Sequence, residues 1–145
     1  MSLARNVHRL DIAAPSAALA RRAGLLVEDA LRTASLPGDG AELVLVRRLD
    51  LPAFTPGVSA QGVAIELESA CRALALVSGR DADDAELAAA RAVHFADALE
   101  AHLALSVRLL AGRPARAWCW ALAVPGYRPD AGIGAGLRRI ALSLA

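Results

Sequence analysis

The chain of 145 residues is long enough for one domain with a sizeable core, and its 16 basic and 15 acidic side chains leave a formal net charge of +1. A charge so near zero excludes a general electrostatic attraction to nucleic acid, so we expect no specific nucleic-acid partner. Hydrophobic residues make up 56% of the chain but aromatic residues only 3%, so leucine, valine and alanine must form the core.

The basic residues are all arginine, a composition typical of a bacterial protein encoded by a high-GC genome. The alternative is that the rigid guanidinium group serves paired or interfacial sites. Cys71 and Cys119 lie in apolar stretches without CxxC spacing, which indicates free thiols rather than a disulfide framework. No apolar signal-peptide core precedes residue 10, and charged residues interrupt every long apolar stretch. The sequence therefore predicts a cytoplasmic protein with no membrane partner.

Two short strands and two helices are predicted in the first half of the chain. The first strand covers residues 6–12, and Ser16 fits the N-cap of a helix that continues to Ala34. The second strand covers residues 43–51, where leucines alternate along one face. Ser59 then caps a second helix, predicted to run to about Val77 and to end at Gly79.

These two strands repeat each other almost letter for letter. Residues 7–12 read Val-His-Arg-Leu-Asp-Ile, and residues 46–51 read Val-Arg-Arg-Leu-Asp-Leu. We interpret residues 6–79 as one βα unit written twice, with the Arg and Asp of each copy forming exposed ion pairs on one face. Two arrangements are open: a parallel pair with a right-handed crossover, or strands related by a local two-fold axis.

The second half of the chain is predicted to be mainly helical. The expected elements are a helix over 84–91, a strand over 92–95, a helix over 97–111, a short helix over 115–124 and a last helix after the glycine-rich run 132–136. In the helix over 97–111, one side carries Leu99, Leu103, Val107 and Leu110. The whole chain is thus expected to form a single domain, residues 1–145, of class α/β (or α+β). It would have a small two- to three-stranded sheet on the duplicated 6–79 scaffold and a helical second half, residues 80–145.

Motifs for catalysis or cofactor binding do not occur. GxSxG, SxxK and GxxxxGK[ST] are absent, and the run 132–136 lacks the strand that precedes a dinucleotide-binding loop. His94 and His102 are eight residues apart, too far to share one metal ion on a continuous helix, although the geometry is open if His94 lies on a strand. We therefore expect a protein that is not an enzyme, with no catalytic residue, metal, cofactor or small-molecule substrate.

Trp118, Trp120 and Tyr127 gather three of the five aromatic residues within ten positions. Two residues apart on a helix, the tryptophans point in nearly opposite directions, so one can be buried while the other contacts a protein partner. The alternative is that both fill gaps in a core of small side chains. The pattern favours neither interpretation.

Residues 7–77 carry arginine-preceded Leu-Asp-Ile and Leu-Asp-Leu runs, each followed by an amphipathic helix. In this the chain resembles the N-terminal regions of tape-measure-like proteins from bacterial contractile injection systems, except that Pro52 stands where the pattern has glycine. The resemblance implies a non-enzymatic assembly component.

We predict a protein-interaction or assembly module that binds a protein partner or itself, through the sheet edge and residues 118–127. The alternative is a small enzyme or ligand-binding domain with a pocket near His94, His102 and Trp120.

Overall fold

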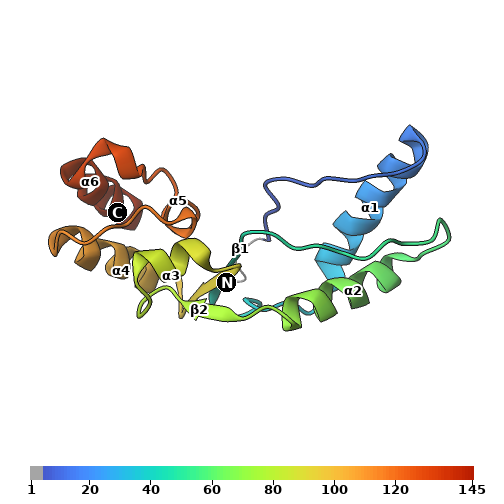
Figure 1. The fold of residues 1–145 in the computed structure, drawn as a ribbon, viewed down its shortest axis with the longest axis horizontal. Coiled ribbons are helices and arrows are strands. Elements are labelled where there is room, and N and C mark those ends of the chain that lie inside the picture. Colours follow the sequence, from blue (N-terminus) through green and yellow to red (C-terminus); the bar gives the residue numbers. More distant parts are fainter. Residues whose placement is uncertain (1–4) are drawn as a thin grey trace. The chain divides into compact units, whose positions relative to one another are not determined.

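The computed structural model describes residues 5–145 and confirms a mixed α/β fold, with six α-helices, a short 3-10 helix and one three-stranded sheet within those residues (Figure 1). The described residues form two units. One unit combines residues 40–48 with 74–145 and contains the sheet, and the other combines residues 5–39 with 49–73. The expected single domain stays a prediction, and each unit is described by itself.

The unit of residues 5–39 and 49–73 is built on helices α1 (Ala17–Thr33) and α2 (Ala60–Arg72). Both predicted caps are confirmed: the Ser16 hydroxyl accepts from the amide of Leu19 at 3.2 Å, and Ser59 accepts from Gly62 at 3.1 Å. The buried core between the helices consists of Ala30, Ala34, Val63, Ala64 and Leu67. Small alanines on both helices allow close approach, as the composition predicts.

The predicted strand over residues 6–12 is wrong. These residues form no regular element and are exposed, and their Arg9–Asp11 ion pair, at 3.0 Å, is a local surface contact. A short strand persists only if a neighbour completes its hydrogen bonds, and this segment has none. The sequence echo is therefore not a repeated βα structure. In the second copy the strand β1 covers only Leu43–Val46, so most of the echoed residues lie beyond its end.

The sheet of the other unit has the order β1-β3-β2, with β3 (Ala92–Phe95) in the centre. β1 pairs with it antiparallel, with Leu45 opposite Val93, and β2 (Leu76–Ser78) pairs parallel, with Val77 opposite Val93. The predicted strand over 92–95 is confirmed. The helix expected to reach Val77 instead ends at Arg72, because its apolar continuation fits a strand equally well and pairing with β3 decides between the two.

Four helices complete this unit: α3 (Asp84–Ala89), α4 (Ala98–Leu110), α5 (Trp118–Ala123) and α6 (Ile133–Leu144). The 3-10 helix η1 (Pro129–Ala131) precedes α6. In Figure 1, α4, α5 and α6 lie together at one end of the unit and α3 lies nearer the sheet. The core of the unit centres on Phe95, Leu105 and Trp120, each with no exposed surface.

Helix α4, the longest helix of this unit, has clear signals at both ends. Its N-cap Asp97 accepts from the amide of Glu100 at 2.7 Å. At its C-terminus Gly112 adopts φ +66°, the amide of Gly112 donates to Leu109 and the amide of Arg113 donates to Arg108. This is a Schellman motif, which favours glycine because its φ is positive. The ends of α4 are therefore well defined by its own sequence.

We expect Gly79→Ala to lower the free energy of unfolding by about 1–3 kcal/mol, because the added methyl group would overlap the ring of Phe95 in the core. Gly134→Ala is the matched control. Position 134 lies in α6 with open space around it, so alanine should raise stability by about 0.4–1 kcal/mol. Urea unfolding followed by circular dichroism measures both changes. Equal effects of the two substitutions would contradict this packing.

Candidate functional site

The carboxylate of Asp84 connects α3 to the start of α5. Its Oδ1 accepts from the amide of Ala117 at 3.1 Å and from Nε1 of Trp120 at 3.2 Å. The amide of Arg116 donates to both of its oxygens, at 3.0 and 3.1 Å. Helix α5 has no side-chain cap of its own, since its N-cap residue is Ala117. Asp84 thus caps α5 from a different helix and satisfies a buried indole at the same time.

Trp120 is fully buried and has one aromatic and one cationic neighbour. Its ring centroid lies 5.7 Å from that of Phe95, and the guanidinium carbon of Arg108 lies 5.1 Å from the Trp120 centroid. Arg108 also donates to the carbonyl of Ala82, and burial lowers the pKa of its guanidinium below the ordinary value. The contact with an indole face and the carbonyl compensate for burying this charge. We refer to Asp84, Arg108 and Trp120 as the Asp84 cluster.

Of the three predicted contact residues, two are buried and one is half-buried. Trp120 and Tyr127 are buried, and the Tyr127 hydroxyl donates to the carbonyl of Ala115 at 3.0 Å. Trp118 is half-buried and its Nε1 donates to the carbonyl of Leu87 at 3.0 Å. Trp120 and Tyr127 therefore lie in the core, which is one of the two alternatives that the sequence left open. A partner contact at Trp118 stays a prediction.

Helix α4 presents apolar side chains on two opposite faces. Its inner face buries Ala101, Leu105 and Leu109. The side predicted to carry leucines turns the other way: Leu99, Leu103, Val107 and Leu110 are 51%, 53%, 55% and 73% exposed. Their spacing of four, four and three residues keeps them on one face. We call these four residues the outer stripe. A helix that is apolar on both faces is typical of one covered on both sides.

A groove of about 520 Å³ lies along three of the four residues of the outer stripe, Leu99, Leu103 and Val107. It is lined by Leu99, Leu103, Val107 and Ala104 of α4, by Arg80, Asp81, Ala96, Asp97 and Glu100 near its N-terminal end, and by Arg108 and Arg113. Arg80 lies 3.6 Å from Glu100 and 3.9 Å from Asp81. Together with Asp97, the N-terminal end of the groove therefore has three carboxylates and the guanidinium group of Arg80. The groove therefore combines an apolar floor with charged walls.

The two histidines do not form a shared site. His94 lies on β3, where its Nδ1 is 3.4 Å from Oε1 of Glu42. His102 lies on the buried side of α4, with Nδ1 2.6 Å from the carbonyl of Ala98, and its buried Nε2 has no hydrogen-bond partner among the described residues. Neither the α4 groove nor the hollow described next is lined by His94, His102 or Trp120. Within residues 5–145 no group of three or more His, Cys, Asp or Glu side chains is arranged to hold a metal ion.

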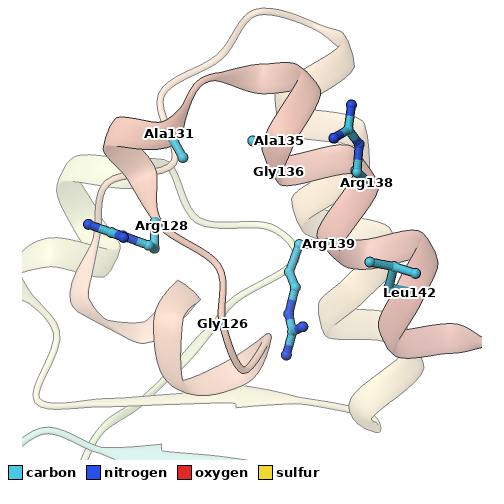
Figure 2. Close-up of a pocket in the computed structure, with 8 residues that line it drawn as sticks. All are labelled: Gly126, Arg128, Ala131, Ala135, Gly136, Arg138, Arg139 and Leu142. Atoms are coloured by element: carbon cyan, nitrogen blue, oxygen red, sulfur yellow. The ribbon is translucent and has the colours of Figure 1, made fainter.

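A second hollow, of about 270 Å³, lies between α6 and the segment from Gly126 to η1, with three arginines among its lining residues (Figure 2). Figure 2 shows the side chains of Arg128, Arg138 and Arg139 pointing in different directions, so they do not converge on one anion. Nε of Arg139 donates to the carbonyl of Pro125 at 2.8 Å, which fixes the turn at Gly126. The arrangement is that of a structural contact.

The glycine-rich run 132–136 also has a structural explanation. Gly132 has φ +86° and precedes α6, while buried Gly136 sits where a Cβ would lie 2.9 Å from Leu109 and 3.2 Å from the ring of Tyr127. Glycine at 136 thus allows α6 to pack closely on α4. The sequence showed only a glycine-rich run before the last helix, and this packing role was missed.

Both cysteines are free and buried. Burial raises the pKa of the Cys71 thiol and raises that of Cys119 to about 11. A thiol held protonated in this way is a poor nucleophile at neutral pH. The two cysteines therefore behave as small apolar side chains.

Among residues 5–145, no helix has both the length and the apolar composition needed to cross a membrane. Comparison of the chain with protein-family models, curated proteins and solved structures finds no match.

We expect Asp84→Ala to lower the free energy of unfolding by about 2–4 kcal/mol, because the start of α5 loses its acceptor and the Trp120 indole is left unpaired in the core. Asp130→Ala is the control. That carboxylate forms an exposed pair with Arg116 at 3.4 Å, so its loss should cost about 0–1 kcal/mol. Urea unfolding followed by tryptophan fluorescence measures both. A loss below about 0.5 kcal/mol for Asp84→Ala would contradict its role as a cap.

Proposed function

We propose that this chain is a non-enzymatic protein-interaction or assembly module whose contact surface is the outer stripe of α4. The observation that carries the proposal is the exposure of four large apolar side chains at helical spacing on a helix whose opposite face is already buried. Single exposed leucines are ordinary on soluble proteins, but a continuous stripe indicates a surface that another molecule covers.

Burial of this stripe supplies a driving force for binding. Each large apolar side chain gains about 1.5–3 kcal/mol on full burial, and these four have half or more of their surface left to bury. The complementary partner is an amphipathic helix, whose anchor residues would follow the same spacing. The charged walls of the groove, including Asp81 and Arg113, would then select the orientation of the partner.

The proposal includes a cytoplasmic location, which two free, buried cysteines support. A narrower proposal names the assembly as a bacterial contractile injection system and rests on the resemblance of residues 7–77 alone. The genes that flank the coding sequence test the narrower proposal. Neighbours encoding sheath, tube or baseplate proteins would support it, and a locus without such genes would count against it.

In the native host, we expect the tagged wild-type protein to migrate on native size separation in a complex larger than one chain. Leu103→Glu should shift it to the size of a monomer, because a charge in the middle of the stripe cannot be buried without a partner. Leu142→Glu is the matched control, since Leu142 is 64% exposed but lies on α6. If both variants stay in the complex, or both leave it, the outer stripe is not the contact surface.

A further inference from the structure

Along the sequence, the four residues of the outer stripe are spaced nearly symmetrically about a midpoint next to Ala104. Leu99 and Leu110 lie at its two ends, and Leu103 and Val107 lie on either side of the midpoint. We propose that the stripe pairs with the same stripe of a second copy, with the two α4 helices antiparallel about a two-fold axis, an inference that rests on the proposed function. Leu99 of one copy then meets Leu110 of the other, and Leu103 meets Val107, as an isologous interface requires.

The charges along the groove favour the antiparallel direction. The N-terminal end of α4 holds Asp81, Asp97 and Glu100 against Arg80, whereas Arg113 is exposed just beyond the C-terminal end. In the antiparallel pair the acidic end of each copy faces the basic end of the other, twice. A parallel pair would bring the three carboxylates of one copy against those of the other. Exposed charges of this kind add little affinity but determine orientation.

The size of the stripe predicts a weak dimer. One face of a 13-residue helix cannot supply the roughly 1,200–2,000 Å² buried in a standard stable interface. We therefore expect a dissociation constant on the order of 10–100 µM for the purified protein. With this affinity the protein would be monomeric when dilute, and the dimer would form at high local concentration, as within an assembly.

Sedimentation equilibrium of the purified full chain over a range of concentrations tests the dimer. We expect a monomer–dimer equilibrium for the wild type and at least tenfold weaker association for Leu103→Glu and, separately, Val107→Glu. Leu142→Glu should associate as the wild type does, and circular dichroism checks that all variants are folded. A wild type that stays monomeric throughout the range overturns the proposal, and so does equal weakening by the Leu142→Glu control.

Charge reversal and cysteine cross-linking test the direction. Arg113→Glu and Asp81→Arg should each weaken the dimer several-fold, and the double variant should recover most of the affinity because the opposed charges are merely exchanged. Leu99→Cys should cross-link to Leu110→Cys but not to itself. Cross-linking of Leu99→Cys to itself would show a parallel pair and overturn the antiparallel arrangement.

The failure of this inference differs from the failure of the proposed function. If the purified chain is monomeric while the native complex still depends on Leu103, the partner is a different protein and only the inference fails. If the native complex is unaffected by Leu103→Glu, the proposed function fails as well.

Discussion

The hydrogen bonds to the Asp84 carboxylate are the interaction on which the rest of the sheet-containing unit depends. Three donors from one short segment converge on this side chain: the amides of Arg116 and Ala117 and the indole of Trp120. Because α5 lacks a capping side chain, its position is determined by an acid that comes from α3, on the connection between β2 and β3. Asp84 itself lies in the first turn of α3, where a negative charge is stabilised by the helix dipole.

The orientation of α4 follows from this arrangement. Trp120, held by Asp84, supplies the ring over which Arg108 of α4 lies, and Leu105 and Leu109 bury the same side of that helix. The inner face of α4 is therefore occupied by contacts within the unit, including the close approach of Gly136. The outer stripe is then the apolar face of the helix that is left in solvent. Its exposure is therefore a consequence of how the core of the unit is packed.

Local signals in the sequence predicted much of this fold. Ser16, Ser59 and Asp97 mark helix starts because their short polar side chains bond to nearby amides, and the largely apolar residues 92–95 predicted a strand at the position of β3. Interactions between distant residues could not be predicted in this way. Residues 76–78 have an apolar pattern that suits helix or strand, and only pairing with β3 decides. Residues 7–12 resemble residues 46–51 in sequence, but a strand pattern without a neighbouring strand stays irregular.

The candidate site, like the fold, could be predicted from the sequence only in part. The outer stripe was visible as a helical periodicity, although the sequence could not show which face of the helix would be buried. The Asp84 cluster was invisible, since nothing local connects an acid on α3 with an indole 36 residues later. Trp120 and Tyr127 attracted attention as aromatic residues in a chain that has few. Their polar atoms find partners inside the core, as buried indole and phenol groups generally do.

The most direct test of pairing through the outer stripe is methyl NMR of the wild-type protein over about a hundredfold range of concentration, wide enough to populate both free and bound forms. If two outer stripes pair, the methyl signals of Leu99, Leu103 and Val107 shift together as the concentration rises, while that of Leu105 on the inner face stays constant. Signals that stay constant at all four positions, or that change at Leu105 and not along the outer stripe, would contradict the pairing of two stripes.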